Sequence, residues 1–293
     1  MQALNANTQS MGVSFTGTDT LSQIVTGLVL IIILYLVLST VDFLYSSFTA
    51  MYRDRVELFP NTYASGSQMY TAIQNPTNPN SATIYQSNNQ RYGVEFSYSM
   101  FLFINSTTIN TSGASAALCH ILHKGYSMPY PLLGPGIFCW NNINTIRIYM
   151  NSFNTWDNYV EVENIPMNKW FHLVVSCKGN SVYVYINGNI KTKLNNMPNS
   201  PPYQNYGNVY AFSSIKPPNN TINPTITASS KETLNFAGSA SGMISRVYYF
   251  SYALTYTEIQ TLINMGPSTV ISGSDMSMVP YLSDTWWTNR NGP

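Results

Sequence analysis

The stretch from residue 164 to residue 194 constrains the fold most, because it spells out consecutive strands together with the turns that join them. Its first strand carries an apolar side chain at every second position, at Phe171, Leu173, Val175 and Cys177. A period of two places these side chains on one face of a strand. The pattern therefore predicts a β-sheet with one face on a hydrophobic core.

The turns in this stretch are equally explicit. Lys178-Gly179-Asn180 precedes a second strand in which Val182, Val184 and Ile186 alternate with polar or aromatic residues. Asn187-Gly188 tolerates the positive φ angles of a type I′ turn, so residues 190–194 are expected to return as a third strand. The whole stretch predicts an antiparallel meander.

Short strands separated by turn residues are also expected on both sides of the meander, at residues 94–104, 116–122, 136–140, 145–150, 159–162, 234–236 and 243–250. A helix is expected over residues 256–265, where Thr255 and Glu258 have the spacing of a capping box and Gly266-Pro267 ends the helix. Regularly spaced short strands are typical of an all-β sandwich. The composition predicts loops, rich in Asn, Pro and Ser, at residues 56–92 and 198–224, with residues 82–85 as a candidate outer strand.

A series of motifs follows one order along the chain: Glu95-Phe96-Ser97-Tyr98-Ser99, His123-Lys124-Gly125, Ile165-Pro166, Lys169-Trp170-Phe171-His172, Val184-Tyr185-Ile186-Asn187-Gly188 and the ending from 238 to 267. This order resembles the laminin G-like and pentraxin-like domains of the concanavalin A-like superfamily. The resemblance covers roughly residues 56–267. It implies an all-β, concanavalin A-like jelly-roll sandwich of two antiparallel sheets.

An apolar segment precedes the sandwich. Residues 20–41 contain no charged residue, and about 20 predominantly apolar residues suffice to cross a bilayer. We expect an N-terminal transmembrane helix over residues 21–41, and the residues that represent this span are Leu21, Ile24, Leu28, Ile31, Ile32, Leu34 and Leu38. A buried core helix and an uncleaved signal sequence are the alternatives; the lack of a positively charged N-terminal region counts against the signal.

The expected organisation is a flexible arm (1–20), the transmembrane helix (21–41), a juxtamembrane stalk (42–55), the sandwich (56–267) and a tail (268–293). Arg53 and Arg55 follow the apolar segment and no basic residue precedes it, so the positive-inside rule places the C-terminal domain on the cytosolic side of a single-pass protein. The tail contains Trp286 and Trp287, which are candidate interaction residues because large aromatic side chains dominate interface energetics.

Charge is scarce along the chain. Only 9% of the 293 residues are charged, against about 25% in typical soluble domains. A neutral polar surface suits packing inside an assembly or against glycans, although compositional drift would give the same result. A net charge of +1 without a basic run predicts no nucleic-acid partner. The cysteines Cys119, Cys139 and Cys177 lack zinc-ligand spacing and are expected to be buried thiols, with a Cys119–Cys139 bridge as the alternative in an extracellular protein.

No residue pattern predicts a catalytic site. Glu161-Val162-Glu163 lacks the further acidic residues of the glycoside hydrolases that share this fold, so the protein is expected not to be an enzyme and to use no cofactor. Weak candidates for calcium binding are Asp157, Asn158 and Glu161, since calcium prefers oxygen ligands. The histidines His120, His123 and His172 lack metal-ligand spacing and are expected to serve packing or hydrogen bonding.

Two functions remain in view. An N-terminal anchor with this type of sandwich resembles virion proteins of large DNA viruses of algae and protists. The resemblance implies a minor capsid protein or a membrane-to-capsid tether at the virion inner membrane beneath the capsid, with capsid proteins and the lipid bilayer as partners. The alternative is a carbohydrate-binding, lectin-like membrane surface protein, for which the sugar-stacking candidates are Trp140, Trp156 and Tyr159. In the cytosolic orientation the sequons at Asn105, Asn110 and Asn219 would stay unmodified.

Overall fold

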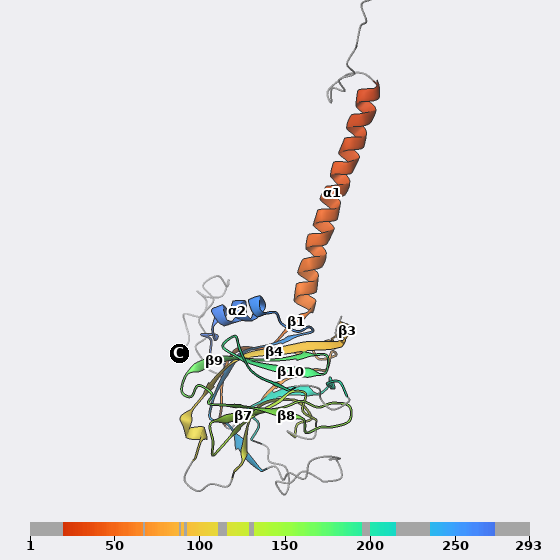
Figure 1. Cartoon of the computed structure of the whole chain (residues 1–293). Helices are drawn as coiled ribbons and strands as arrows, with labels where there is room; N and C mark the ends of the chain where they lie inside the picture. The colour runs from red at the N-terminus through yellow and green to blue at the C-terminus, as the bar shows by residue number, and fades with distance from the viewer. Residues whose placement is uncertain are drawn as a thin grey trace, which may run out of the picture. The chain divides into compact units, whose positions relative to one another are not determined.

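The computed structural model describes residues 20–66, 68–87, 89–90, 93–110, 116–128, 132–194, 200–214 and 235–272. The chain divides into two units, Met1–Arg53 and Asp54–Pro293. The described part of the first unit is a helix, and the second unit is a sandwich of two β-sheets (Figure 1). The protein therefore has the expected all-β class, a sandwich of two β-sheets preceded by an N-terminal apolar helix.

Helix α1 (Thr20–Arg53) has 34 residues and continues without a break beyond the expected transmembrane segment. Its stretch Ser22–Tyr45 is long and apolar enough to cross a membrane, and its most apolar part is not buried. The residues named for the expected span are all exposed where the structure describes their side chains, at Ile24, Leu28, Ile31, Ile32, Leu34 and Leu38. The side chain of Leu21 lies outside the described part.

Sheet A is the layer that contains the predicted meander. In the described part of the chain its strands run in the order β1 (Arg55–Ala64), β14 (Gly242–Phe250), β4 (Gly93–Ile104), β9 (Trp170–Lys178), β10 (Ser181–Ile186) and β11 (Asn189–Leu194), with β3 (Asn89–Gln90) on β4. All the pairings within this sheet are antiparallel.

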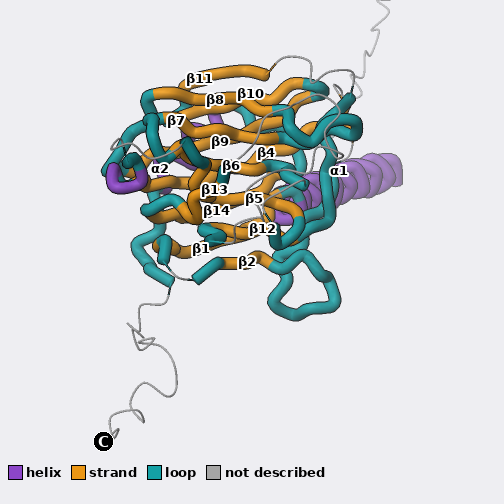
Figure 2. The backbone as a smooth tube through the Cα atoms, turned by 90° about the horizontal axis from the view of Figure 1, so that it is seen from below, coloured by secondary structure: helices purple, strands orange, loops and turns teal. Residues whose placement is uncertain are grey.

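Sheet B is the second layer (Figure 2). Its described strands run in the order β2 (Tyr70–Ala72), β12 (Asn208–Ala211), β5 (Leu118–Gly125), β6 (Gly136–Trp140), β7 (Thr145–Tyr149) and β8 (Tyr159–Glu163). The strand β13 (Phe236–Ser239) pairs with β5 in parallel, which departs from the otherwise antiparallel sheet. The 3-10 turn η1 (Ser106–Thr108) and helix α2 (Tyr256–Met265) complete the described elements.

The meander prediction is confirmed, because β9 pairs with β10 and β10 with β11. At the second turn Asn187 has a φ of 48° and Gly188 a φ of 77°, as a type I′ turn requires. A Cβ atom at Gly188 would also meet the end of the Gln260 side chain on α2, which would have to move aside. The capping box of α2 is likewise present between Thr255 and Glu258.

The prediction that strand β9 has one face on a core was incomplete, since both faces are buried. Phe171, Leu173, Val175 and Cys177 join the core between the sheets. The opposite face of sheet A packs on α2 through a second cluster, made of Val174, Tyr248, Phe250, Leu254, Ile259 and Leu262. Figure 1 shows α2 on the side of sheet A that faces away from sheet B.

Four strands, β1, β2, β3 and β12, lie in segments whose composition predicted loops, and those predictions were wrong. Strand β1 begins at Arg55, and bulges between Glu57 and Phe59 and between Phe59 and Thr62 break its two-residue period. Strand β12 is four residues long, too short to show a period. Residues 82–85, the candidate outer strand, form no strand; the Gln74 side chain instead bonds the Ala82 carbonyl (2.8 Å) and the Ile84 amide (2.8 Å).

The three cysteines are buried free thiols, as expected. Cys119 and Cys139 lie opposite each other on β5 and β6 without forming a disulfide. Burial raises the pKa of the Cys139 thiol to about 12 and also raises that of Cys177. The thiols therefore stay protonated at neutral pH and act as small apolar side chains.

Candidate functional site

On the outer face of sheet B, the predicted residues Trp140, Tyr159 and Glu161 surround Arg147, which the sequence analysis did not select. Arg147 stands on β7 between Ile146 and Ile148, both of which face the core between the sheets, so its side chain points outward. Trp140 comes from β6, and Tyr159 and Glu161 come from β8; both strands are neighbours of β7. A single arginine matches no site motif, but a charged residue between two core-facing isoleucines could have indicated a side chain on the outer face of the sheet.

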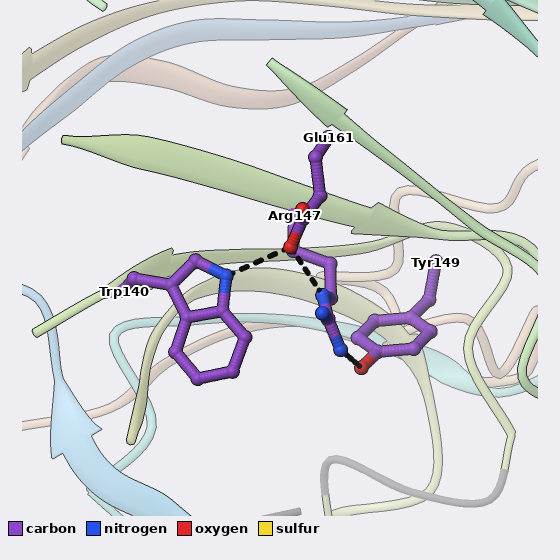
Figure 3. Close-up of polar contacts among 4 residues, drawn as sticks. All are labelled: Trp140, Arg147, Tyr149 and Glu161. Atoms are coloured by element: carbon purple, nitrogen blue, oxygen red, sulfur yellow. Dashed lines mark hydrogen bonds and ion pairs between the residues drawn. The ribbon is translucent and has the colours of Figure 1, made fainter. Parts of the chain in front are cut away.

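The Arg147 guanidinium is buried and fully surrounded. Its Nε lies 2.8 Å from Glu161 Oε1, and its other arm donates a hydrogen bond to the Tyr149 hydroxyl (3.1 Å). The Trp140 indole donates to the same Glu161 oxygen (2.9 Å), as Figure 3 shows. The guanidinium carbon also lies 4.0 Å from the ring centre of Tyr159 and 4.7 Å from that of Trp140. One carboxylate and several ring faces thus stabilise a single buried cation.

A second aromatic contact extends this group toward Trp156. The Tyr149 ring lies 5.7 Å from Tyr159 and stacks on Trp156 at 6.3 Å. Trp156 is only 6% exposed, and its indole N–H has no hydrogen-bond partner in the described part of the chain. Trp156 lines a pocket of about 310 Å³ together with the exposed Phe153 and with Tyr203, whose rings lie 5.1 Å apart. Tyr149 therefore joins Tyr159 to Trp156, and Arg147 links Trp140 to the same group.

The calcium candidates make different contacts. The Asn158 side-chain nitrogen donates to Ser152 Oγ (3.2 Å) and to the Thr155 carbonyl (3.3 Å). Glu161 accepts from Arg147 and Trp140. Among the described residues, no group of three or more His, Cys, Asp or Glu side chains could hold a metal ion. A calcium site at Asp157, Asn158 and Glu161 stays a prediction.

Glu161 and Glu163 occupy alternate positions of β8, which is the edge strand of sheet B. Glu163 is exposed, whereas Glu161 is engaged by Arg147 and Trp140. A glycosidase needs two carboxyl groups that flank the sugar bond. In this arrangement Glu161 accepts hydrogen bonds from the two protein side chains and orients them.

The histidines form hydrogen bonds, as predicted. His120 Nδ1 accepts from the Ser213 amide (2.9 Å), His120 Nε2 lies 2.7 Å from His123 Nδ1, and His123 Nε2 donates to the Tyr126 carbonyl (2.7 Å). This series is satisfied with one proton on each ring, so both imidazoles are neutral. Burial lowers the pKa of His120 well below its usual value and lowers the pKa of His123 to about 4.

On sheet A, His172 Nε2 hydrogen-bonds to the Ser99 hydroxyl (2.8 Å), and burial lowers the pKa of His172 to about 4. Three predicted features, namely Trp286, Trp287 and the sequon at Asn219, lie outside the described residues.

No protein-family model matches this chain, and a comparison with curated proteins finds no match. Among solved structures, the botulinum neurotoxin serotype D binding domain is similar at 13% identity over 70% of this chain and 41% of that chain, with a TM-score of 0.44. The binding domain of botulinum neurotoxin DC in complex with SialylT gives 16% identity, 72% and 42% coverage, and a TM-score of 0.44. A Trypanosoma rangeli sialidase gives 12% identity, 60% and 24% coverage, and a TM-score of 0.38. The chain spans less than half of each of these chains, and likeness at this level carries no argument about function.

Proposed function

We propose that this protein is a membrane-anchored, non-enzymatic interaction protein in which α1 crosses a bilayer and the sandwich binds a partner. The observation that carries the proposal is the apolar stretch Ser22–Tyr45, whose most apolar part is not buried. This exposure argues against a core helix, because exposed apolar surface of this extent is unfavourable in water. A bilayer removes the same surface from water.

Membrane integration tests the anchor directly. The full chain should stay with liposomes after an alkaline carbonate wash, whereas a variant with Leu28→Arg and Ile32→Arg should be released, since each central arginine costs about 2.5–3.5 kcal/mol on insertion scales. A matched control with Leu28→Ala and Ile32→Ala should stay bound. Release of the wild-type chain, or cleavage after α1, would instead identify a soluble protein or a signal sequence.

The sandwich should fold without α1, because all the residues of its three apolar clusters lie between Leu58 and Leu262. A chain of residues 54–293 is expected to be soluble and to give a β-rich circular dichroism spectrum. A helix-dominated spectrum would contradict this. We further propose that the sandwich faces the cytosol, so a glycosylation tag fused to its C-terminus should remain unmodified in microsomes.

In its finer form, the proposal is a minor capsid or tether protein that links the inner membrane of a large DNA virus to the capsid above it. Support comes from the sequence resemblance and from the 9% charged residues, which suit close packing in an assembly. Residues 1–19 and 273–293 would make the contacts with capsid proteins, with Trp286 and Trp287 as anchors. Residues 268–272 of the expected tail belong to the sandwich instead, because they hydrogen-bond to Thr62 and Ser245.

The tether form is tested by replacing both tryptophans with Ala. Truncating buried interface aromatics typically costs upwards of about 2 kcal/mol of binding, so incorporation into particles should fall while the thermal stability of the sandwich stays unchanged. The opposite pattern, a destabilised sandwich with normal incorporation, would assign the tail to the fold instead.

The second candidate is glycan binding at the outer face of sheet B, and the unpartnered Trp156 indole in the 310 Å³ pocket favours it. A sugar could stack on the exposed Phe153 ring and accept a hydrogen bond from Trp156. On a glycan array, Trp156→Phe keeps an aromatic ring but removes the N–H and should weaken binding, as should Phe153→Ala. Ile190→Ala, at an exposed position of β11, is the matched control. Equal binding by all four proteins would exclude this pocket.

A further inference from the structure

A cavity of about 630 Å³ lies beside the inter-sheet core, away from the Arg147 group. Tyr98 on β4 and Tyr249 on β14 reach it from sheet A, and both rings belong to the core between the sheets. Lys124 reaches it from β5, opposite the core residue Val209 in the register with β12. The remainder of the wall consists of loop residues, at 74–76, 83–86, 134 and 204–206, and of Asn208 at the start of β12. The volume falls within the range of about 300–1,000 Å³ that is usual for ligand sites.

Lys124 is a buried cation without a charged partner. The residue as a whole is 3% exposed, and its Nζ donates one hydrogen bond to the Gly207 carbonyl (2.6 Å). No described carboxylate forms an ion pair with it, so an ammonium with three N–H groups has two donors left. Burial lowers the pKa of Lys124 to about 8, which leaves the group mostly charged at neutral pH. A buried charge of this kind favours an anionic partner.

Tyr98 adds a second donor from the opposite sheet. Its ring is 2% exposed, and its hydroxyl has no hydrogen bond to any residue that the structure describes. Burial raises the pKa of Tyr98 well above its usual value, so the O–H keeps its proton. The neighbouring Tyr249 differs, because its hydroxyl donates to the Tyr85 carbonyl (2.9 Å) and accepts from Gln204 (3.2 Å).

We propose that this cavity binds a small organic carboxylate, with the carboxylate held by the Lys124 ammonium and the Tyr98 hydroxyl. Lys124 is the sole charged residue among the described residues of the wall, which suits a monoanion better than a phosphate dianion. The rings of Tyr85, Tyr206 and Tyr249 provide surface for an organic body. This binding site is separate from the partner-binding role proposed above and does not depend on it.

The test uses the full chain in detergent micelles and measures binding by NMR titration. The probes are benzoate and glucuronate, their neutral counterparts benzamide and glucose, and inorganic phosphate. At least one carboxylate should bind tenfold more tightly than its counterpart and than phosphate. Lys124→Met should weaken that binding at least tenfold and Tyr98→Phe about threefold, while Lys191→Met, an equal change of charge at an exposed site, should have no effect.

Carboxylates that bind no better than their counterparts, phosphate that binds more tightly than both, or retained binding in Lys124→Met would each overturn the proposal. Acetylation of the wild-type chain provides a test that does not require the variant to fold. Near pH 8, saturating benzoate or glucuronate should slow acetylation of Lys124 at least threefold, measured by mass spectrometry, and leave the exposed Lys169 and Lys191 unchanged. Equal rates at Lys124 with and without both probes would also overturn the proposal.

Discussion

The two sheets share one core but differ in what covers their outer faces. Helix α2 covers the outer face of sheet A through Ile259 and Leu262, which pack on Val174, Tyr248 and Phe250. The outer face of sheet B has an aromatic cluster under loops instead, made of Leu118, Leu133, Phe138, Tyr149, Trp156 and Phe236. Arg147 contacts the Tyr149 of that cluster.

The polar groups on the two faces differ as well. On sheet A, Ser97 Oγ donates to the Tyr252 carbonyl (2.9 Å) and accepts from the Leu254 amide (3.0 Å), so it fixes the segment that leads into α2. On sheet B, the polar groups include the buried Arg147 guanidinium and the neutral pair His120 and His123. They also include the indole N–H of Trp156, which has no described partner. Each outer face has one buried ring nitrogen without a described partner, His172 Nδ1 on sheet A and Trp156 Nε1 on sheet B. Trp156 also lines a pocket of about 310 Å³, which is why we propose sheet B as the face that binds a ligand.

Acid should produce the largest effect and should act mainly through sheet B. Because the pKa values of His120, His123 and His172 are lowered in the fold, the unfolded chain binds protons that the folded chain does not once the pH falls below about 6.5. The free energy of unfolding should therefore fall as the pH drops from about 6.5 toward about 4, by about 1.4 kcal/mol per pH unit for each histidine. Urea unfolding of residues 54–293 at pH 7 and pH 5 measures the change.

Variants separate the two faces in this experiment. Between pH 7 and pH 5 the sheet B pair should account for roughly 4 kcal/mol of the loss and His172 for roughly 2 kcal/mol. Replacing His120 and His123 with Gln should therefore remove about twice as much of the pH dependence as His172→Gln does. A stability that stays level down to pH 5 in the wild type would mean that these imidazoles are not held neutral by burial.

The next largest effect should come from the helix that covers sheet A. Ile259 is the residue of α2 that is fully buried against sheet A, so Ile259→Ala should lower the free energy of unfolding by about 3 kcal/mol, from lost apolar burial and the cavity left behind. Met265→Ala, on the same helix but 39% exposed, should change it by less than about 0.5 kcal/mol. Both changes in the free energy of unfolding are measured by the shift of the urea unfolding midpoint. Equal losses in the two variants would mean that α2 does not pack as described.

The elements with long or repeated local patterns could be predicted from the sequence. The alternation in β9, the Asn187-Gly188 turn and the Thr255 to Glu258 capping box each specify their local geometry within a few residues. Strand β1 could not be predicted, because its bulges interrupt the period that identifies a strand. The burial of both faces of β9 depends on α2, about 80 residues later in the chain, which no local pattern reports.

The candidate site shows the same limit. Trp140, Tyr159 and Glu161 were selected for their chemistry alone, and sequence gave no reason to join the rings to the carboxylate. Arg147 could have been selected from its place between Ile146 and Ile148, but its contacts with the rings and the carboxylate become visible only when β6, β7 and β8 are placed side by side in register. The Lys124 cavity is even less visible, since its wall combines strands of both sheets with loops between residues 74 and 208.

The smallest effect should come from the Arg147–Glu161 pair, and it tests whether the outer face of sheet B is built for stability or for binding. The Glu161 side chain is 33% exposed, so solvent screens the pair, and a double-mutant cycle with Arg147→Met and Glu161→Gln should give a coupling of about 1 kcal/mol or less in the free energy of unfolding. Because Trp140 donates to Glu161, each single variant should also shift the tryptophan fluorescence. A coupling of about 3 kcal/mol or more would instead mark the pair as a structural centre of the fold, as α2 is for sheet A. The contrast between a closed face and a binding face would then be wrong.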